Sequence, residues 1–185
     1  WTSNHQVDYL GFSSQRRWDF NTNGNFEGWT IVNHLSNATV NSGYLNANVT
    51  GNDPIIENTG INAKSSIFKH LIIRVKNNTA GTYGSIFWKT NTENYYCANK
   101  SKQFLVTAND NGYTEYYIDL GSSAYWQNTI TDIRIDIPEN ASSGSVSYDY
   151  IALSPTKEPV LGPVSSVEAT SSNIFVSGSI SCKNA

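Results

Sequence analysis

The chain has 185 residues, a formal net charge of −3 at pH 7 and only 15% charged residues. These values fit one globular domain and exclude a nucleic-acid-binding surface, which requires a clear excess of basic residues. No apolar run reaches the roughly 18–20 residues of a membrane-spanning helix. The polar residues are mainly Asn (23), Ser (23) and Thr (16), and aromatic residues make up 12% of the chain. Because these residue types favour turns and strands over helices, the composition indicates a secreted or cell-surface all-β protein.

Residues 1–17 are polar and irregular, and we expect them to form an N-terminal arm. From Trp18 onward, short apolar runs alternate with clusters of Gly, Asn, Asp and Pro, which is the pattern of an antiparallel β-sandwich. The predicted strands are Trp18–Phe20, Gly28–Asn33, Ala38–Asn41, Tyr44–Val49, Pro54–Glu57, Lys69–Lys76, Gly84–Thr90, Lys102–Thr107, Glu115–Leu120, Thr129–Ile137 and Ser145–Leu153. Eleven strands within residues 18–154 predict two stacked sheets, as in a jelly roll.

Several predicted strands alternate apolar and polar side chains. In Thr131–Ile137 the two faces are distinct, because Ile133, Ile135 and Ile137 oppose Asp132, Arg134 and Asp136. We assign Trp18 and Trp29 to the core, which is the commonest place for tryptophan in a sandwich. Trp88 follows Phe87 directly, so one of the two faces inward, and the sequence alone does not decide which.

The segment after the sandwich differs in composition. Residues 155–164 contain three of the five prolines, which predicts a stiff, extended linker. Residues 165–185 include an amphipathic strand, Ser172–Cys182, whose apolar face carries Ile174, Val176 and Ile180. No further strand follows it, and an isolated strand is not stable in water. We therefore expect it to pair with its own sandwich, with a missing domain or with a neighbouring copy of the chain.

The sequence resembles the jelly-roll modules of the carbohydrate-binding, galactose-binding-like type in three segments. These are WDFNTNGNFEGW, FLVTANDNGYTEYYIDLGSSAYWQNTITDIRIDI and SVSYDYIALS, which open, continue and close the predicted sandwich. The resemblance covers about residues 18–154. It implies a β-sandwich of the kind appended to secreted polysaccharide-degrading enzymes and cell-surface proteins, with a glycan or polysaccharide as its partner.

The same resemblance implies a structural Ca²⁺, because related modules often hold one where the first and last strands meet. On this sequence it implicates Asp19 and Asp149, with Glu27 as an outside candidate. Calcium takes six to eight oxygen ligands, and backbone carbonyls of converging strands can supply those that the carboxylates do not. In the alternative interpretation, Asp19 caps a turn and Asp149 is an ordinary outward-facing polar residue.

Sugar binding requires flat aromatic faces together with polar side chains that bond to hydroxyl groups. The candidate ligand-binding residues are Arg74, Trp88, Tyr95, Tyr96, Tyr117 and Trp126, accompanied by Glu93, Asp132 and Arg134. Each aromatic residue in this set has the alternative of being a core residue.

Catalytic signatures are weak, and we expect no enzymatic activity. The three histidines have no metal-binding spacing. Asp132 and Asp136 lie four residues apart on one predicted strand face, about 13 Å, whereas a glycosidase pair needs roughly 5–10 Å. The two carboxylates are therefore interpreted as solvated surface charges.

The two cysteines, Cys97 and Cys182, are expected to form a disulfide, either within the chain or between copies. The alternative is two unrelated free thiols. The chain also contains five N-glycosylation sequons, at Asn37, Asn48, Asn77, Asn99 and Asn140. With 23 asparagines, about five sequons arise by chance, so their number carries no weight.

Two functions fit the sequence. The first is a non-catalytic extracellular carbohydrate-binding module, indicated by the resemblance and the aromatic surplus. The second is a structural subunit of an extracellular glycoprotein filament or surface array. In that case the terminal segments would add a strand to a neighbouring copy and build a head-to-tail polymer.

Overall fold

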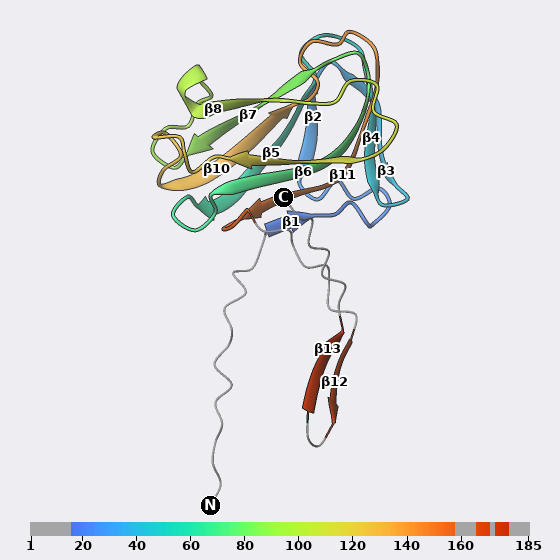
Figure 1. Ribbon diagram of the computed structural model, residues 1–185. Helices are drawn as coiled ribbons and strands as arrows, with labels where there is room; N and C mark the ends of the chain where they lie inside the picture. Colours follow the sequence, from blue (N-terminus) through green and yellow to red (C-terminus); the bar gives the residue numbers. More distant parts are fainter. Residues whose placement is uncertain (1–15, 158–165, 171–172, 178–185) are drawn as a thin grey trace, which may run out of the picture.

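The computed structural model describes residues 16–157 and, beyond them, the backbone of residues 166–170 and 173–177. Two antiparallel sheets pack face to face (Figure 1). Sheet A has the order β3 (Leu35–Asn41), β4 (Tyr44–Val49), β11 (Gly144–Ser154), β6 (His70–Asn78) and β9 (Thr114–Asp119), and β1 (Arg16–Trp18) also pairs with β11. Sheet B has the order β2 (Trp29–Asn33), β5 (Ile55–Lys64), β10 (Thr129–Asp136), β7 (Tyr83–Thr90) and β8 (Ser101–Leu105).

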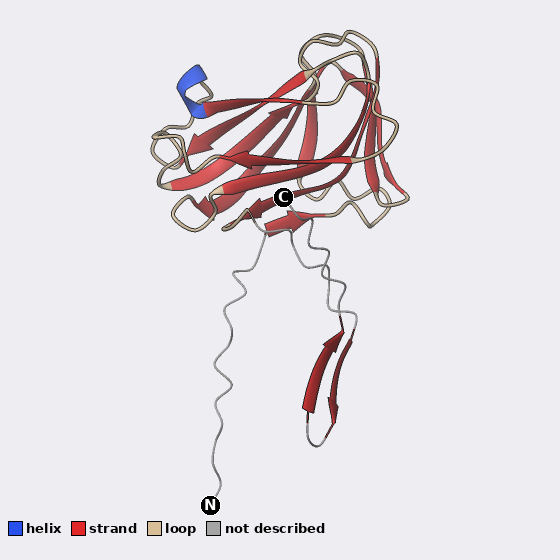
Figure 2. Cartoon of the chain, viewed as in Figure 1, coloured by secondary structure: helices blue, strands red, loops and turns tan. Residues whose placement is uncertain are grey.

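The predicted all-β sandwich is confirmed. In the described part of the chain, the only helical element is one 3-10 turn, η1 (Ala98–Lys100), as Figure 2 shows. Each of the eleven predicted segments overlaps a strand of the sandwich, although β1 begins at Arg16, two residues before the expected boundary. No helix in the described ranges has the length and hydropathy that crossing a bilayer requires.

Strand β5 is much longer than predicted. The prediction ended at Glu57 because the residues that follow include Asn and Gly, which are uncommon in strands. The backbone at Gly60 and Asn62 is left-handed, with φ of 74° and 50°, and the partner strand β10 shifts register nearby. This irregularity lets Ile61 and Ala63, each 1% exposed, still reach the core. The polar composition of the segment hid a strand that tertiary packing stabilises.

The core between the sheets contains two pairs of tryptophans. Trp18 and Trp29 meet edge to face with ring centroids 5.5 Å apart, which confirms their assignment to the core. Trp88 and Trp126 make the same contact at 5.2 Å and are 0% and 6% exposed. Their burial corrects the expectation that they contact a ligand, because neither indole offers a free face at the surface.

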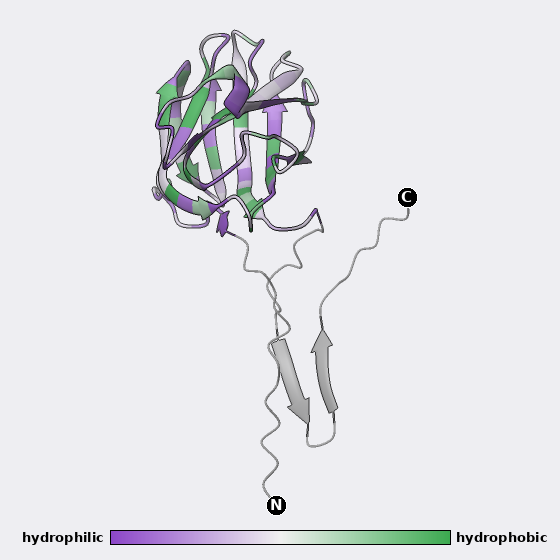
Figure 3. Cartoon of the chain, turned by 90° about the vertical axis from the view of Figure 1, so that its left-hand side faces the viewer, coloured by the Kyte–Doolittle hydropathy of each residue, from purple (hydrophilic) through white to green (hydrophobic). Residues whose placement is uncertain are grey.

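Strand β10 shows how the sandwich separates its two faces. Ile133 and Ile135 are fully buried between the sheets, and the residues between them point to the outer side. Polar and apolar residues alternate in this way along several strands (Figure 3). However, Asp132 and Asp136 are only 8% and 1% exposed. The expectation of solvated surface charges is therefore wrong, because neighbouring side chains on the outer side cover both carboxylates.

The C-terminal segment forms a hairpin rather than a lone strand. Strand β12 (Ser166–Thr170) pairs antiparallel with β13 (Asn173–Ser177), with Val167 opposite Val176 and Ala169 opposite Ile174. The expectation of a strand without a partner in its own segment is therefore corrected. Several predicted parts lie outside the described residues, namely residues 1–15 of the arm, residues 158–164 of the linker, and Ile180 and Cys182.

Candidate functional site

The outer side of sheet B carries a row of side chains that crosses all five strands. The strand register places Thr30, Glu57, Arg134, Phe87 and Ser101 opposite one another, on β2, β5, β10, β7 and β8 in that order. Because neighbouring strands lie about 4.8 Å apart, the row spans roughly 19 Å. It is flanked by Asp132 and Lys89, which also lie opposite each other, and by Asp136. We call these eight residues the sheet B face.

Two cations organise the charges of this face. Lys89 Nζ lies 3.4 Å from Glu57 Oε1 and 3.8 Å from Asp132 Oδ1. Arg134 makes a two-pronged contact with Asp136, through Nη2–Oδ2 at 2.6 Å and Nε–Oδ1 at 2.7 Å. Its Nη2 also donates to Asp53 Oδ1 at 3.2 Å. The face thus presents alternating positive and negative groups, with the Arg134 side chain still 24% exposed.

Burial sets the protonation of Asp136. Removal from water raises the pKa of this carboxyl to about 6, although the hydrogen bonds and charge of Arg134 act in the opposite direction. Burial alone would lower the pKa of Arg134, but its hydrogen bonds to Asp136 and the charges of Asp136 and Asp53 raise the pKa above its ordinary value. Arg134 therefore stays charged while Asp136 titrates close to neutral pH.

Stability should depend on pH through Asp136. Its pKa is about 6 in the folded protein against an ordinary value of 3.8, so the folded state holds this proton more tightly than the unfolded state. The resulting stabilisation is complete below about pH 4 and is lost as pH rises through 6. Between pH 4 and 7, the unfolding free energy of the native protein should fall by roughly 2–3 kcal/mol relative to that of Asp136→Asn. Urea denaturation of both proteins across this range measures the difference, and parallel pH curves would contradict it.

Aromatic rings lie against both cations. The Phe87 ring centroid is 4.9 Å from the Arg134 guanidinium carbon. Tyr96, from the loop after β7, lies with its ring 4.5 Å from Lys89 Nζ and donates its hydroxyl proton to Glu57 at 2.5 Å. Burial, followed by this hydrogen bond, raises the pKa of Tyr96 far above its ordinary value, so the hydroxyl stays protonated.

A buried lysine anchors the loop that carries Tyr96. Lys100 is 0% exposed, and its Nζ donates to the Glu93 backbone oxygen at 3.0 Å and lies 3.5 Å from the Glu93 carboxylate. The same ammonium is 3.9 Å from the centroid of Tyr95, whose side chain remains 54% exposed. Tyr95 and Glu93 are thus held together at the rim of the sheet B face, while Tyr96 lies over it.

The predicted ligand residues are therefore divided between opposite sides of the sandwich. Tyr95, Tyr96, Glu93, Asp132 and Arg134 gather on or beside the sheet B face. Arg74 and Tyr117 lie on sheet A instead, where Arg74 pairs with Asp149 and Tyr117 bonds to Glu115.

Glu57, Phe87 and Lys89 are among the residues of the sheet B face that were missed as candidates. A sequence signal for them exists, because each is next to a buried apolar residue on a predicted strand, namely Ile56 or Trp88. The alternation of side chains then places all three on the outer side of the sheet.

The residues proposed for Ca²⁺ do not form a suitable ligand set. The carboxylate of Asp19 pairs with Arg17 and that of Asp149 pairs with Arg74, so both are already neutralised by cations of the chain. Among the described residues, no three His, Cys, Asp or Glu side chains gather in a way that could hold a metal ion. The expected calcium site is not supported by this donor arrangement.

One of the predicted glycosylation sites differs from expectation. Asn77 is 1% exposed, and its side-chain amide donates to the backbone oxygens of Gly81 and Thr107 at 2.8 and 2.9 Å, so the folded chain has no room for a glycan there. The other four sequon asparagines are exposed. Cys97 has a free thiol in the structure, and its expected partner Cys182 lies outside the described residues.

Comparison with solved structures identifies the fold. The chain is similar to the low-affinity xylan-binding module of family 86 from Roseburia intestinalis, with a TM-score of 0.51 and 12% identity over 76% of this chain and 94% of that one. It is also similar to a lysine-to-alanine variant of a family 29 carbohydrate-binding module, with a TM-score of 0.54 and 11% identity over 80% of this chain and 100% of that one. Other similar family 29 structures contain cellulohexaose or mannohexaose. No protein-family model and no curated protein matches the sequence. The protein thus has the β-sandwich fold of carbohydrate-binding modules, as the sequence resemblance predicted.

Proposed function

We propose that the protein is a carbohydrate-binding domain that holds a polysaccharide chain along the sheet B face. The observation that carries this proposal is the row Glu57–Arg134–Phe87, which places an anion, a cation and an aromatic ring side by side on three neighbouring strands. The row crosses the whole sheet, so it offers contacts to several successive sugar rings.

The chemistry of the face suits neutral sugars. Hydroxyl groups both donate and accept hydrogen bonds, so carboxylates and cations in alternation can satisfy them on either side. Phe87 and Tyr95 supply the apolar surface that the C–H faces of a pyranose ring need. Family 29 modules were altered at tyrosine, lysine, aspartate and arginine to probe ligand recognition. The sheet B face and its rim contain the same residue types, which supports the proposal.

We further propose that the domain binds without turnover and acts outside the cell. The carboxylates of the face are committed to cations: Glu57 and Asp132 to Lys89, and Asp136 to Arg134. Carboxylates held in this way position ligand hydroxyls and keep the two cations in place. We propose the extracellular location because polysaccharides of the cell wall or surface are the polymers that such a face would meet.

A matched pair of double variants tests the site. Arg134→Met with Asp136→Asn removes the central ion pair of the sheet B face without leaving a buried charge alone. Arg74→Met with Asp149→Asn makes the same change on sheet A, where Arg74 also lies over an aromatic ring, that of Tyr113. We expect the first variant to bind its glycan about 10- to 100-fold more weakly, since a hydrogen bond to a charged group contributes about 1.5–3 kcal/mol. The second variant should bind normally.

Titration calorimetry with cellohexaose, mannohexaose and soluble xylan provides the measurement. Binding of at least one probe that is lost only with the Arg134 variant supports the proposal. Absence of binding to every probe, or equal loss in the two double variants, would overturn it.

A further inference from the structure

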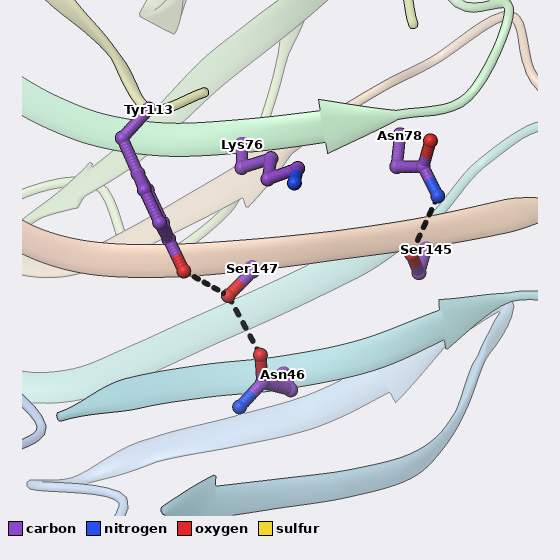
Figure 4. A pocket seen from close by; sticks show the side chains of 6 residues that line it. All are labelled: Asn46, Lys76, Asn78, Tyr113, Ser145 and Ser147. Atoms are coloured by element: carbon purple, nitrogen blue, oxygen red, sulfur yellow. Dashed lines mark hydrogen bonds between the residues drawn. The ribbon is translucent and has the colours of Figure 1, made fainter. Parts of the chain in front are cut away.

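A polar pocket lies on the side of the sandwich opposite the sheet B face, on the outer side of sheet A. It has a volume of about 260 Å³ and is lined by Asn46, Lys76, Asn78, Tyr113, Ser145 and Ser147, which Figure 4 shows. None of these residues belongs to the sheet B face. We call this cavity the sheet A pocket.

The strand register builds the floor of this pocket. Ser147 on β11 lies opposite Asn46 on β4 and Lys76 on β6. Two residues away along the same strand, Ser145 lies opposite Asn78. Neighbouring strands are about 4.8 Å apart and alternate residues of one strand about 7 Å apart, so these side chains form a small grid of polar groups.

Hydrogen bonds hold one wall of the pocket in place. The Tyr113 hydroxyl lies 2.8 Å from Ser147 Oγ, which donates to Asn46 Oδ1 at 2.6 Å (Figure 4). The amide nitrogen of Asn46 is in turn fixed by Asn41 Oδ1 at 3.1 Å. The Tyr113 ring stacks on Tyr44 at 4.9 Å with an interplanar angle of 14°. This wall is therefore preorganised for hydrogen bonding to a ligand.

The charge of the pocket is unbalanced. Lys76 is the one charged residue among the six that line it. In the described part of the chain its ammonium has no hydrogen-bond or ion-pair partner, in contrast to Arg74 nearby, whose charge is balanced by Asp149. A ligand that brings both hydroxyl groups and one negative charge would complement the pocket better than a neutral one.

We propose that the sheet A pocket binds an acidic sugar unit, with its carboxylate on Lys76 and its hydroxyls on Asn78, Ser145, Ser147 and Tyr113. The site goes beyond the proposed binding of neutral glycan at the sheet B face, and the two sites lie on opposite sides of the sandwich. The domain can then engage a neutral chain on one side and a uronate-bearing chain on the other.

Two-dimensional NMR titration of the full chain with trigalacturonate tests this site, with cellotriose as the neutral probe. We expect trigalacturonate, and not cellotriose, to shift the backbone amides of Lys76, Ser145 and Ser147. Lys76→Gln should raise the dissociation constant about tenfold, because it removes one charge-assisted hydrogen bond. Lys64→Gln, which alters an exposed lysine at the end of β5, should leave it unchanged.

A control titration with sodium sulfate at equal ionic strength distinguishes a site for an acidic sugar from a site that binds any anion. Shifts of equal size with sulfate and trigalacturonate would mean an adventitious ion only and would overturn the proposal, as would equal weakening by the two lysine variants. The Arg134 double variant should keep trigalacturonate binding intact. Failure of the sheet B proposal is therefore distinguishable from failure of this one.

Discussion

Replacing Trp88 with alanine is expected to lower the free energy of unfolding by about 3–5 kcal/mol. The indole is 0% exposed, meets Trp126 edge to face and donates its Nε1 proton to the Tyr125 backbone oxygen at 2.9 Å. The substitution therefore opens a cavity in the core and leaves a carbonyl without its partner.

Phe87→Ala is the matched control, because it removes an aromatic ring from the preceding residue on the other side of the same sheet. Phe87 is partly exposed and packs on Arg134, so we expect a loss of only about 1 kcal/mol. The effects on glycan binding should have the opposite order. Phe87→Ala should weaken binding more than Trp88→Ala does, since Phe87 belongs to the sheet B face. Urea denaturation gives both values, and a larger loss for Phe87→Ala than for Trp88→Ala would contradict the inward orientation of Trp88.

Replacing Lys100 with alanine is expected to lower the free energy of unfolding by about 2 kcal/mol and to weaken glycan binding several-fold. This buried ammonium holds Glu93 and Tyr95 in place. Without it, the loop that brings Tyr96 onto Lys89 and Glu57 loses its anchor, although the strands of sheet B keep their register.

Lys102→Ala serves as the comparison, because Lys102 lies two residues further along and, within the described residues, its side chain bonds only to the exposed Ser122, at 3.2 Å. We expect Lys102→Ala to lower the free energy of unfolding by less than about 0.5 kcal/mol. Hydrogen exchange at residues 91–97 should accelerate in Lys100→Ala alone. Equal stability and equal exchange in the two variants would show that Lys100 does not anchor the loop.

The sandwich was predictable because its strands follow local rules. Alternation along β10 correctly placed the isoleucines on the inner side and the charged residues on the outer side, and turn residues divided the chain at nearly the right places. The longest segment that the prediction missed is the second half of β5. Its Asn and Gly residues do not indicate a strand, and pairing with β10 stabilises it. The C-terminal hairpin was missed for a related reason, since Ser166–Thr170 has too little apolar pattern to indicate a strand by itself.

The candidate site was predictable only in part. The sequence supplied Arg134, Asp132 and Tyr96 as candidates, yet it also included Trp88 and Trp126, which the core takes up. The pairing of strands decides which side chains meet at the surface and which are buried. Local residue spacing does not determine that pairing. Glu57 and Arg134 are far apart along the chain, and only the pairing of β5 with β10 brings them together. The same long-range pairing explains why Asp136 is buried and titrates near pH 6.

The most direct measurement is a map of backbone amide shifts during titration with cellohexaose, mannohexaose or xylan oligosaccharides. A carbohydrate site on sheet B predicts shifts concentrated at Glu57, Phe87, Lys89, Arg134 and the loop at residues 91–97, with the strands of sheet A unaffected. Saturable shifts confined to β4, β6 and β11, or no shifts with any of these glycans, would contradict it.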